Sequence, residues 1–449
     1  MSAPAASTAP SRPLTGRQRP ARVVDVELAR PLEPIAAELP DGRRYDEAWL
    51  VVHLFEEPVG LVPVSLAGGR AEVAAQAAAV RRACGDLVRE RARLAGVPAA
   101  PLLAGTGVEL AGEAPFLRRH RAVRPDGPEI TVVLCTRNRP DDLRRALASL
   151  ERQSYPRFGV LVVDNAPSDE RTAELVTQYA GSARRVQYVR EPRPGLSWAR
   201  NRALTEVATP VVAWLDDDEE ADRHWLAEIA CAFAENPRAV AVSGSVVPAE
   251  LETQPQLWFE QYGGHTKGRG FRPADFHGPD PDGQSALYPL PSFGVGANMA
   301  FAKDALVAVG GFDPALGAGT ATLGGEDTLV FTQLLLRGGL VLYRPSALTR
   351  HYHRPDYDAL ARQMTGYGVG LTAYYASLLR SDWRLTVPLL RLAPRALRDT
   401  FGPGGRRLSG VPDSFPAELL RRKTRGMLAG PFAYLRARRR ARALGGGRS

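Results

Sequence analysis

Short apolar runs alternate with amphipathic segments through the middle of the chain. Runs typical of buried strands occupy residues 130–135 (ITVVLC), 158–163 (FGVLVV), 186–189 and 210–215 (PVVAWL). Between them, apolar residues recur at helical spacing in residues 141–153, 171–179 and 196–205. Strands that alternate with helices in this way predict a doubly wound α/β sheet, in which ligands bind at the carboxyl ends of the strands.

The pattern differs on both sides of this central part. Before it, strand-like runs at residues 22–28, 49–55 and 60–66 and a helical segment at 71–94 predict a small α+β unit without evident chemistry. After a strand at residues 340–343, helices are predicted over 357–379, 383–401 and 432–444. We expect a disordered leader (1–20), an N-terminal accessory α+β domain (21–125), a catalytic domain (126–355) and a helical basic C-terminal region (356–449).

Composition indicates a globular chain whose charge is unevenly spread. The 449 residues are 44% hydrophobic, which is ordinary for a chain with a sizeable core. The net charge is +9, yet residues 381–449 alone carry sixteen Lys or Arg against four acidic residues. Apolar residues are interleaved with this basic tail, which fits either peripheral attachment to an anionic membrane or a solvated helix. Nucleic acid is not an expected partner, because no nucleic-acid module is recognisable and the body is nearly neutral.

Cysteine use and hydropathy favour a cytoplasmic protein. The three cysteines, Cys84, Cys135 and Cys231, are too few and too widely spaced for a disulfide framework or a zinc cluster. No run approaches the roughly 18 apolar residues that span a bilayer, and the first twenty residues lack the apolar centre of a signal peptide. We therefore expect a cytoplasmic location, with the basic tail as the candidate for peripheral attachment to the inner face of the cell membrane.

Three adjacent acids, Asp216, Asp217 and Asp218, directly follow the fourth predicted strand. Adjacent carboxylates repel one another unless something neutralises them, and a hard divalent cation does so. If the extended geometry persists, Asp216 and Asp218 share one face. An acidic triplet can also be a solvated loop tip, but polar residues at two other strand ends, 136–139 and 164–165, favour a functional site.

Two later segments carry further candidate chemistry. Glu326 and Asp327 open an apolar helix after a glycine-rich loop, where a carboxylate can serve as a general base or only as a partner of the helix dipole. His351 and His353 share one face of an extended segment, so both could bind a metal; alternatively one is a ligand or phosphate contact and the other a bystander. Between residues 247 and 291 the periodicity disappears, which fits an acceptor site or an excursion packed by its own aromatic residues.

Taken in order, the motifs resemble those of the family 2 glycosyltransferases, which have the GT-A, nucleotide-diphospho-sugar transferase fold. The motifs, which all lie between residues 130 and 354, are ITVVLCTRNRP, LVVDNAPSDE, GLSWARNRAL, WLDDDE, GANMAFAKDALVAVGGFD and GGEDTLV. Within this set, WLDDDE looks like the DxD motif of the family. The N-terminal unit is not accounted for by the resemblance.

The resemblance implies a role for each candidate residue. On the donor side, Thr136, Arg137 and Arg139 would line the nucleotide pocket, Asp164 would contact the base, and Arg200 and Asn201 would lie near the pyrophosphate. Asp216 would approach the ribose and Asp218 would hold the metal, with Asp217 ambiguous between those roles. Asp327 would be the general base, with Glu326 as the alternative. His351 would complete the set of metal ligands. Asp216 is a further candidate ligand, and His353 is a weaker candidate than His351.

The implied activity is an inverting transfer of a sugar, dependent on Mg²⁺ or Mn²⁺, from a nucleotide-diphospho-sugar to a hydroxyl of a saccharide, lipid-linked or small-molecule acceptor. Such transfer would serve cell-envelope polysaccharide, glycolipid or natural-product glycosylation. Processive synthesis is not expected, because the Gln-x-x-Arg-Trp motif of processive synthases is not matched. A nucleotidyltransferase on a related fold is disfavoured because CTRNRPDD contains no glycine. A non-catalytic nucleotide-sugar-binding or membrane adaptor would be expected to lose the metal or base carboxylates, and these are present.

Overall fold

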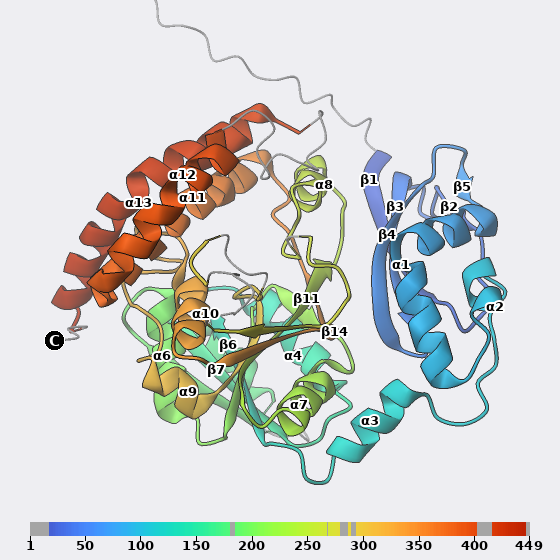
Figure 1. The fold of residues 1–449 in the computed structure, drawn as a ribbon, viewed down its shortest axis with the longest axis horizontal. Helices are drawn as coiled ribbons and strands as arrows, with labels where there is room; N and C mark the ends of the chain where they lie inside the picture. Colours follow the sequence, from blue (N-terminus) through green and yellow to red (C-terminus); the bar gives the residue numbers. More distant parts are fainter. Residues whose placement is uncertain are drawn as a thin grey trace, which may run out of the picture.

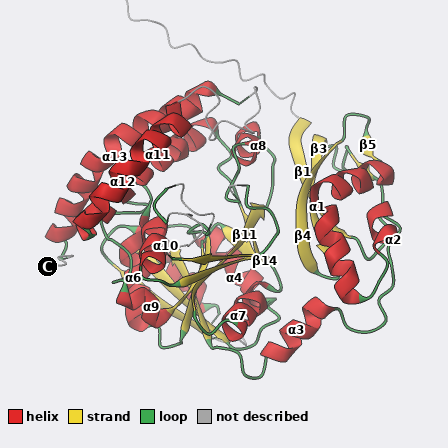
Figure 2. Ribbon diagram, in the orientation of Figure 1, coloured by secondary structure: helices red, strands yellow, loops and turns green. Residues whose placement is uncertain are grey.

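The computed structural model describes residues 18–179, 185–266, 268–278, 286–288, 293–401 and 415–445. Three groups of elements follow one another along the chain: an N-terminal sheet with its helices, a large central sheet, and a set of C-terminal helices (Figures 1 and 2). The first and last groups lie on opposite sides of the central sheet (Figure 1). Most of the expected leader lies outside the described residues, and its last three residues, 18–20, belong to the first strand.

The N-terminal unit is a three-stranded sheet with helices packed beside it. β1 (Gln18–Glu27) pairs in parallel with β3 (Arg44–Leu54), which forms an antiparallel hairpin with β4 (Glu57–Ser65). The other elements of the unit are β2 (Ile35–Ala36), β5 (Arg70–Ala71), α1 (Val73–Ala95), α2 (Ala99–Ala104) and α3 (Pro115–Val123). The hairpin turn consists of Phe55 and Glu56, both with positive φ, as a tight two-residue turn requires. Helices α2 and α3 of this unit were not predicted from the sequence.

The central sheet contains all four strands that the apolar runs predicted. These strands and the helices between them are β6 (Ile130–Thr136), α4 (Pro140–Glu151), β7 (Phe158–Asn165), α5 (Arg171–Thr177), β8 (Val186–Glu191), α6 (Leu196–Glu206) and β9 (Val211–Leu215). The four strands are parallel, in the order β9-β6-β7-β8, so their carboxyl ends meet at one edge.

The second half of the sheet makes it mixed. Its elements are β10 (Glu219–Ala221), α7 (Trp225–Glu235), β11 (Ala239–Pro248), α8 (Gln254–Gln261), β12 (Ala274–His277), β13 (Asn298–Ala302), α9 (Lys303–Ala308), α10 (Glu326–Leu336) and β14 (Leu340–His351). Because β13 runs antiparallel to β9 and β11, the nine-stranded sheet contains both kinds of pairing. Apolar clusters fill both faces of this sheet. The expected doubly wound mixed α/β sheet, with an N-terminal α+β unit and a helical C-terminal extension, is confirmed.

The C-terminal region consists of α11 (Tyr357–Ser381), the short 3₁₀ helix η1 (Trp383–Leu385), α12 (Thr386–Phe401) and α13 (Ala417–Ala443). Helix α13 begins fifteen residues before the predicted start at 432. Glycines let α11 and α13 approach closely, since a Cβ at Gly368 would lie 1.9 Å from the carbonyl oxygen of Lys423. Among the described residues, no helix has both the length and the apolar character needed to cross a bilayer.

Candidate active site

Asp216, Asp217 and Asp218 lie in a tight turn at the carboxyl end of β9. The strand ends at Leu215, and the N–H of Glu219 donates to the carbonyl of Asp216 over 3.2 Å. Because a turn replaces the extended backbone here, the alternation of side chains expected for a strand does not apply. Asp217 and Asp218 contact the same guanidinium group, whereas Asp216 lies beside another arginine. The shared face expected for Asp216 and Asp218 is therefore not found.

Residues from the end of β6 contact two of these acids. Arg139 Nη1 lies 3.1 Å from Asp217 Oδ1 and 3.1 Å from Asp218 Oδ2. The hydroxyl of Thr136 donates to Asp217 Oδ2 over 2.7 Å. A second cation approaches from beyond β14, where Arg354 Nη2 lies 3.5 Å from Asp218 Oδ2. Polar residues after β6, β9 and β14 thus meet at the carboxyl edge of the sheet, as expected for a ligand site in this kind of fold.

The three carboxyl groups differ in how burial and charge set their pKa values. Burial raises the pKa of Asp216 to about 7 and that of Asp217 to about 6. Burial acts on Asp218 in the same direction, but the charges of His351, Arg354 and Arg139 together outweigh it and hold its pKa below the ordinary value. Burial lowers the pKa of His351 itself to about 4, so its contribution requires acid, and at neutral pH the two guanidinium groups are the charges that act on Asp218. Asp218 is therefore the acid of the three that ionises most readily.

Arg200, on α6, links the acidic turn to the start of α10. Its side chain is buried, and Nη1 donates to Glu326 Oε1 over 2.9 Å. Nη2 donates to the carbonyl of Gly296 over 3.1 Å and lies 3.7 Å from Asp216 Oδ1. Burial opposes the charge of the guanidinium, but the two carboxylates outweigh it and raise the pKa of Arg200. The carboxylate of Glu326 therefore forms an ion pair with Arg200.

Asp327 is partly exposed in the first turn of α10. The N–H of Gly296 donates to Asp327 Oδ2 over 2.7 Å, and the Thr328 hydroxyl donates to Oδ1 over 3.3 Å. The turn before it packs directly on α11, because a Cβ at Gly325 would lie 2.6 Å from the carbonyl oxygen of Gly370. Helix α11 therefore fixes the point at which the carboxylate of Asp327 enters the site.

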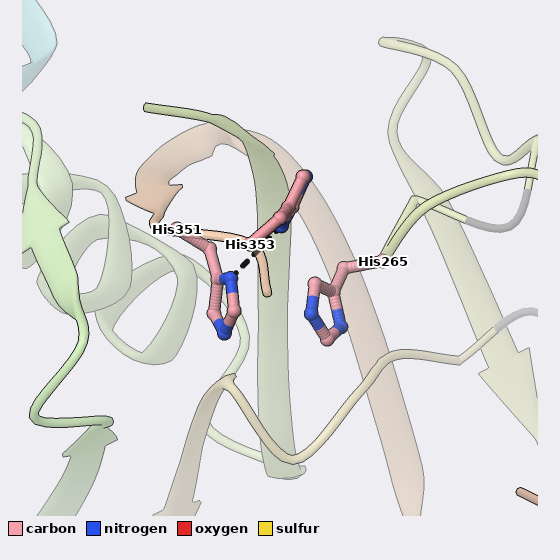
Figure 3. Close-up of side chains that lie close together, drawn as sticks. All are labelled: His265, His351 and His353. Atoms are coloured by element: carbon pink, nitrogen blue, oxygen red, sulfur yellow. Dashed lines mark hydrogen bonds between the residues drawn. The ribbon is translucent and has the colours of Figure 1, made fainter. Parts of the chain in front are cut away.

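His351 stands at the end of β14 and faces the acidic turn. Its Nε2 lies 3.4 Å from Asp218 Oδ1, and its Nδ1 lies 3.0 Å from Nδ1 of His353 (Figure 3). The backbone fixes this arrangement, since Glu219 pairs with His351 and the N–H of Tyr352 donates to the carbonyl of Asp218 over 3.0 Å. The two histidines at i, i+2 are therefore neighbours.

Three other residues expected in the site have different surroundings. The buried Asp164 at the end of β7 accepts a 2.9 Å hydrogen bond from the Tyr188 hydroxyl, and burial raises its pKa. The amide of Asn201 binds both backbone groups of Phe312, at 2.7 and 2.8 Å, so it holds a loop instead of facing the acids. Arg137 is exposed beside the site.

Several residues at the site were not predicted from the sequence. They are Glu219, Glu260, His265 and Arg354. The ring centroid of His265 lies 4.5 Å from that of His351, and ligand atoms of His265, His351 and His353 lie within 4.8 Å of one another (Figure 3). Glu219 directly follows the acidic triplet and Arg354 directly follows His353, so a predicted site residue next to each in the sequence could have pointed to it. Glu260 and His265 had none, because they come from the segment without periodicity.

The donor atoms at this edge fit a divalent cation. A carboxylate oxygen of Asp218 and a ring nitrogen of His351 face each other at 3.4 Å, a separation compatible with two ligands of one ion. Carboxylate and imidazole together suit Mn²⁺ better than Mg²⁺, which prefers oxygen ligands. Burial raises the pKa values of Asp216 and Asp217, and a cation bound in the same turn would favour their ionised forms.

Comparison with known proteins relates part of this sheet to a family of transferases. Residues 131–310 match the family described as glycosyl transferase family 2. Residues 131–310 therefore form a family 2 glycosyltransferase domain, as the sequence motifs predicted, and the protein is a glycosyltransferase.

Similar proteins cover only part of the chain. A glucosyl-dolichyl phosphate glucuronosyltransferase of Haloferax volcanii is 25% identical over 52% of this chain and 72% of its own length. The succinoglycan biosynthesis protein ExoM of Rhizobium meliloti is 28% identical over 49% of this chain and 65% of its own length. Among solved structures, the mannosyltransferase PcManGT from Pyrobaculum calidifontis, in complex with GDP-Man and Mn²⁺, is 18% identical with a TM-score of 0.43. That alignment covers 74% of this chain and 83% of the other.

Proposed function

We propose that this enzyme is a metal-dependent, inverting glycosyltransferase that moves a sugar from a nucleotide-diphospho-sugar to an acceptor hydroxyl. The observation that carries the proposal is the facing pair of Asp218 and His351 beside Arg139, with Arg200 extending the site toward Asp327. The cell-envelope, glycolipid or natural-product context expected from the sequence is part of this proposal. The acceptor is a saccharide, a lipid-linked sugar or a small molecule.

On the donor side, the chain's own residues supply binding and charge. Asp218 and His351 would hold Mn²⁺ or Mg²⁺, with Asp216 as a further ligand, and the ion would neutralise charge that develops on the departing nucleoside diphosphate. Arg139 and Arg200 are positioned to add cationic stabilisation near that group. Thr136, Arg137, Asp164 and Asn201 remain candidates for contacts with the nucleotide, directly or through the loops that they hold.

On the acceptor side, Asp327 is the proposed general base. It is partly exposed, and among the described residues its carboxylate accepts from a backbone N–H and a hydroxyl group, without an ion pair. Glu326 is the weaker candidate because its carboxylate is paired with Arg200. A base that takes the proton of an acceptor hydroxyl allows the oxygen to attack the anomeric carbon opposite the leaving diphosphate, which inverts that centre.

The stereochemistry of the product tests this mechanism. From an α-linked nucleotide sugar, we expect only a β-linked product, because a single displacement inverts the anomeric carbon. Proton NMR of the anomeric region during turnover measures this directly, and a product that retains the α linkage would contradict the proposed role of Asp327. A nucleotidyltransferase would instead form a new nucleotide sugar with release of pyrophosphate, which the same spectra distinguish.

We further propose that the C-terminal helices attach the enzyme to an anionic membrane surface. On α12, the exposed side chains of Val387, Leu390 and Leu397 fall on one face, beside a stripe formed by Arg391, Arg395 and Arg398. On α13, Leu428 and Phe432 are each 75% exposed. They lie on the same face of the helix as arginines that precede and follow them. Apolar side chains flanked by arginines fit insertion at the headgroup level of anionic lipids.

The membrane proposal predicts a loss of vesicle binding in Leu390→Glu/Leu397→Glu. We expect the wild type to sediment with phosphatidylglycerol-containing vesicles and the variant to do so at least about tenfold less, because two charges replace inserted side chains. Val307→Glu, which changes a similarly exposed apolar residue of α9, is the matched control and should bind as the wild type does. Equal sedimentation of wild type and double variant would contradict this docking surface.

A further inference from the structure

A line of buried polar side chains runs from α8 to the acidic turn. His353 Nε2 lies 2.6 Å from Glu260 Oε1, His353 Nδ1 lies 3.0 Å from His351 Nδ1, and His351 Nε2 lies 3.4 Å from Asp218 Oδ1. Glu260 and His353 are almost completely buried, so water does not compete for these contacts. Figure 3 shows the two histidine rings of this line with the bond between them.

Hydrogen-bond chemistry fixes where the protons lie along the line. A carboxylate only accepts, so a neutral His353 must carry its proton on Nε2, facing Glu260. Its Nδ1 is then an acceptor, and His351 must donate from Nδ1. The one proton of a neutral His351 is thereby used, which leaves a lone pair on Nε2 that faces an oxygen of Asp218. Two acceptors at 3.4 Å with no proton between them repel, unless a cation lies between them.

The opposite assignment gives a different site. If His353 carried a proton on both nitrogens, it would donate to His351 Nδ1, and His351 would place its proton on Nε2 toward Asp218. That arrangement would bind Asp218 internally and remove His351 as a metal ligand. A doubly protonated His353 would place a positive charge on a ring whose side chain is only 1% exposed, which burial disfavours.

We propose that Glu260 and His353 are positioning residues that hold His351 in its Nδ1–H tautomer, so that its Nε2 and Asp218 can bind the divalent metal together. The inference rests on the metal site of the proposed function. A carboxylate that orients a metal-binding histidine is a common arrangement, and here it acts through a second histidine. The segment without periodicity thus contributes to the donor side through α8.

The test measures Mn²⁺ affinity by electron paramagnetic resonance in the full chain. We expect Glu260→Ala to bind Mn²⁺ about 10- to 100-fold more weakly than the wild type, the usual effect of losing such an orienting partner. Glu260→Gln should stay within about threefold of the wild type, because its amide oxygen can still accept from Nε2–H of His353. Trp258→Phe, on the same helix but outside the line, is the control for packing and should retain wild-type affinity.

A second measurement separates orientation from mere packing. Nitrogen-15 NMR of labelled histidines in the metal-free wild type should find the proton of His351 on Nδ1, and Glu260→Ala should lose this preference. Unchanged Mn²⁺ affinity in Glu260→Ala, or a proton on Nε2 of His351 in the wild type, would overturn the inference while leaving the metal site standing. Unchanged Mn²⁺ affinity in Asp218→Asn would overturn the proposed metal site and this inference with it.

Discussion

Asp218→Asn is expected to abolish metal-dependent donor binding and to lower the rate of sugar transfer at least about 100-fold. Asp218 is the acid whose cationic neighbours keep its pKa low, and it faces the ring nitrogen of His351. An amide oxygen in its place is a weaker ligand for a hard cation and brings no charge. Isothermal titration of the nucleotide with and without Mn²⁺ measures the binding, and release of nucleoside diphosphate measures the rate.

The fold should survive this substitution. Arg139 keeps its contact with Asp217, and the repulsion among three adjacent carboxyl groups is relieved, so the melting temperature should change by only a few degrees. Asp86→Asn, which removes one exposed negative charge from α1 of the N-terminal unit, is the matched control and should leave binding unchanged. Metal-dependent binding of wild-type strength in Asp218→Asn would remove this residue from the metal site.

Asp327→Asn is expected to retain donor binding and to lose transfer by about 10²- to 10⁴-fold, the range that a general base supplies. The amide can still accept the hydrogen bond from the N–H of Gly296, so the start of α10 should keep its geometry. Titration of the nucleotide should therefore give an affinity close to that of the wild type, while turnover at saturating donor and acceptor falls.

Glu326→Gln is the matched comparison for this prediction. Its amide oxygen can still accept from Arg200, and the proposed base is untouched, so we expect a smaller loss of turnover than in Asp327→Asn. A larger loss in Glu326→Gln would transfer the role of base to Glu326. Full activity in Asp327→Asn would exclude Asp327 from the mechanism.

The parallel half of the sheet was predictable because buried parallel strands are continuous apolar runs. The second half of the sheet and its helices were less predictable. In α7, the eight residues from Trp225 to Ala232 are all buried, so the segment has no polar face and lacks the amphipathic period of a surface helix. Strand β14 was predicted only as far as Tyr343; it continues past Pro345 through an irregular pairing with β11 to His351.

The position of Asp216, Asp217 and Asp218 at the carboxyl edge of the sheet was predictable, but their geometry was not. Acids at strand ends converge because parallel strands share one carboxyl edge, which any sequence with this pattern implies. That Asp217 and Asp218 share Arg139 depends on the turn after Leu215, which the alternation rule for strands does not describe. The contact of Glu260 with His353 joins residues 93 positions apart and has no local sequence signal.

The central claim is that the carboxyl edge of the sheet binds a nucleoside diphosphate together with a divalent metal. Thermal denaturation of the wild-type enzyme with UDP-, GDP- and dTDP-sugars, each with Mn²⁺ or with EDTA, tests it most directly. A ligand that binds only the folded protein raises the melting temperature. We predict that one nucleotide class stabilises the enzyme in Mn²⁺ and that EDTA removes the effect. Stabilisation of equal size in EDTA, or none by any of the three classes in Mn²⁺, would contradict the account.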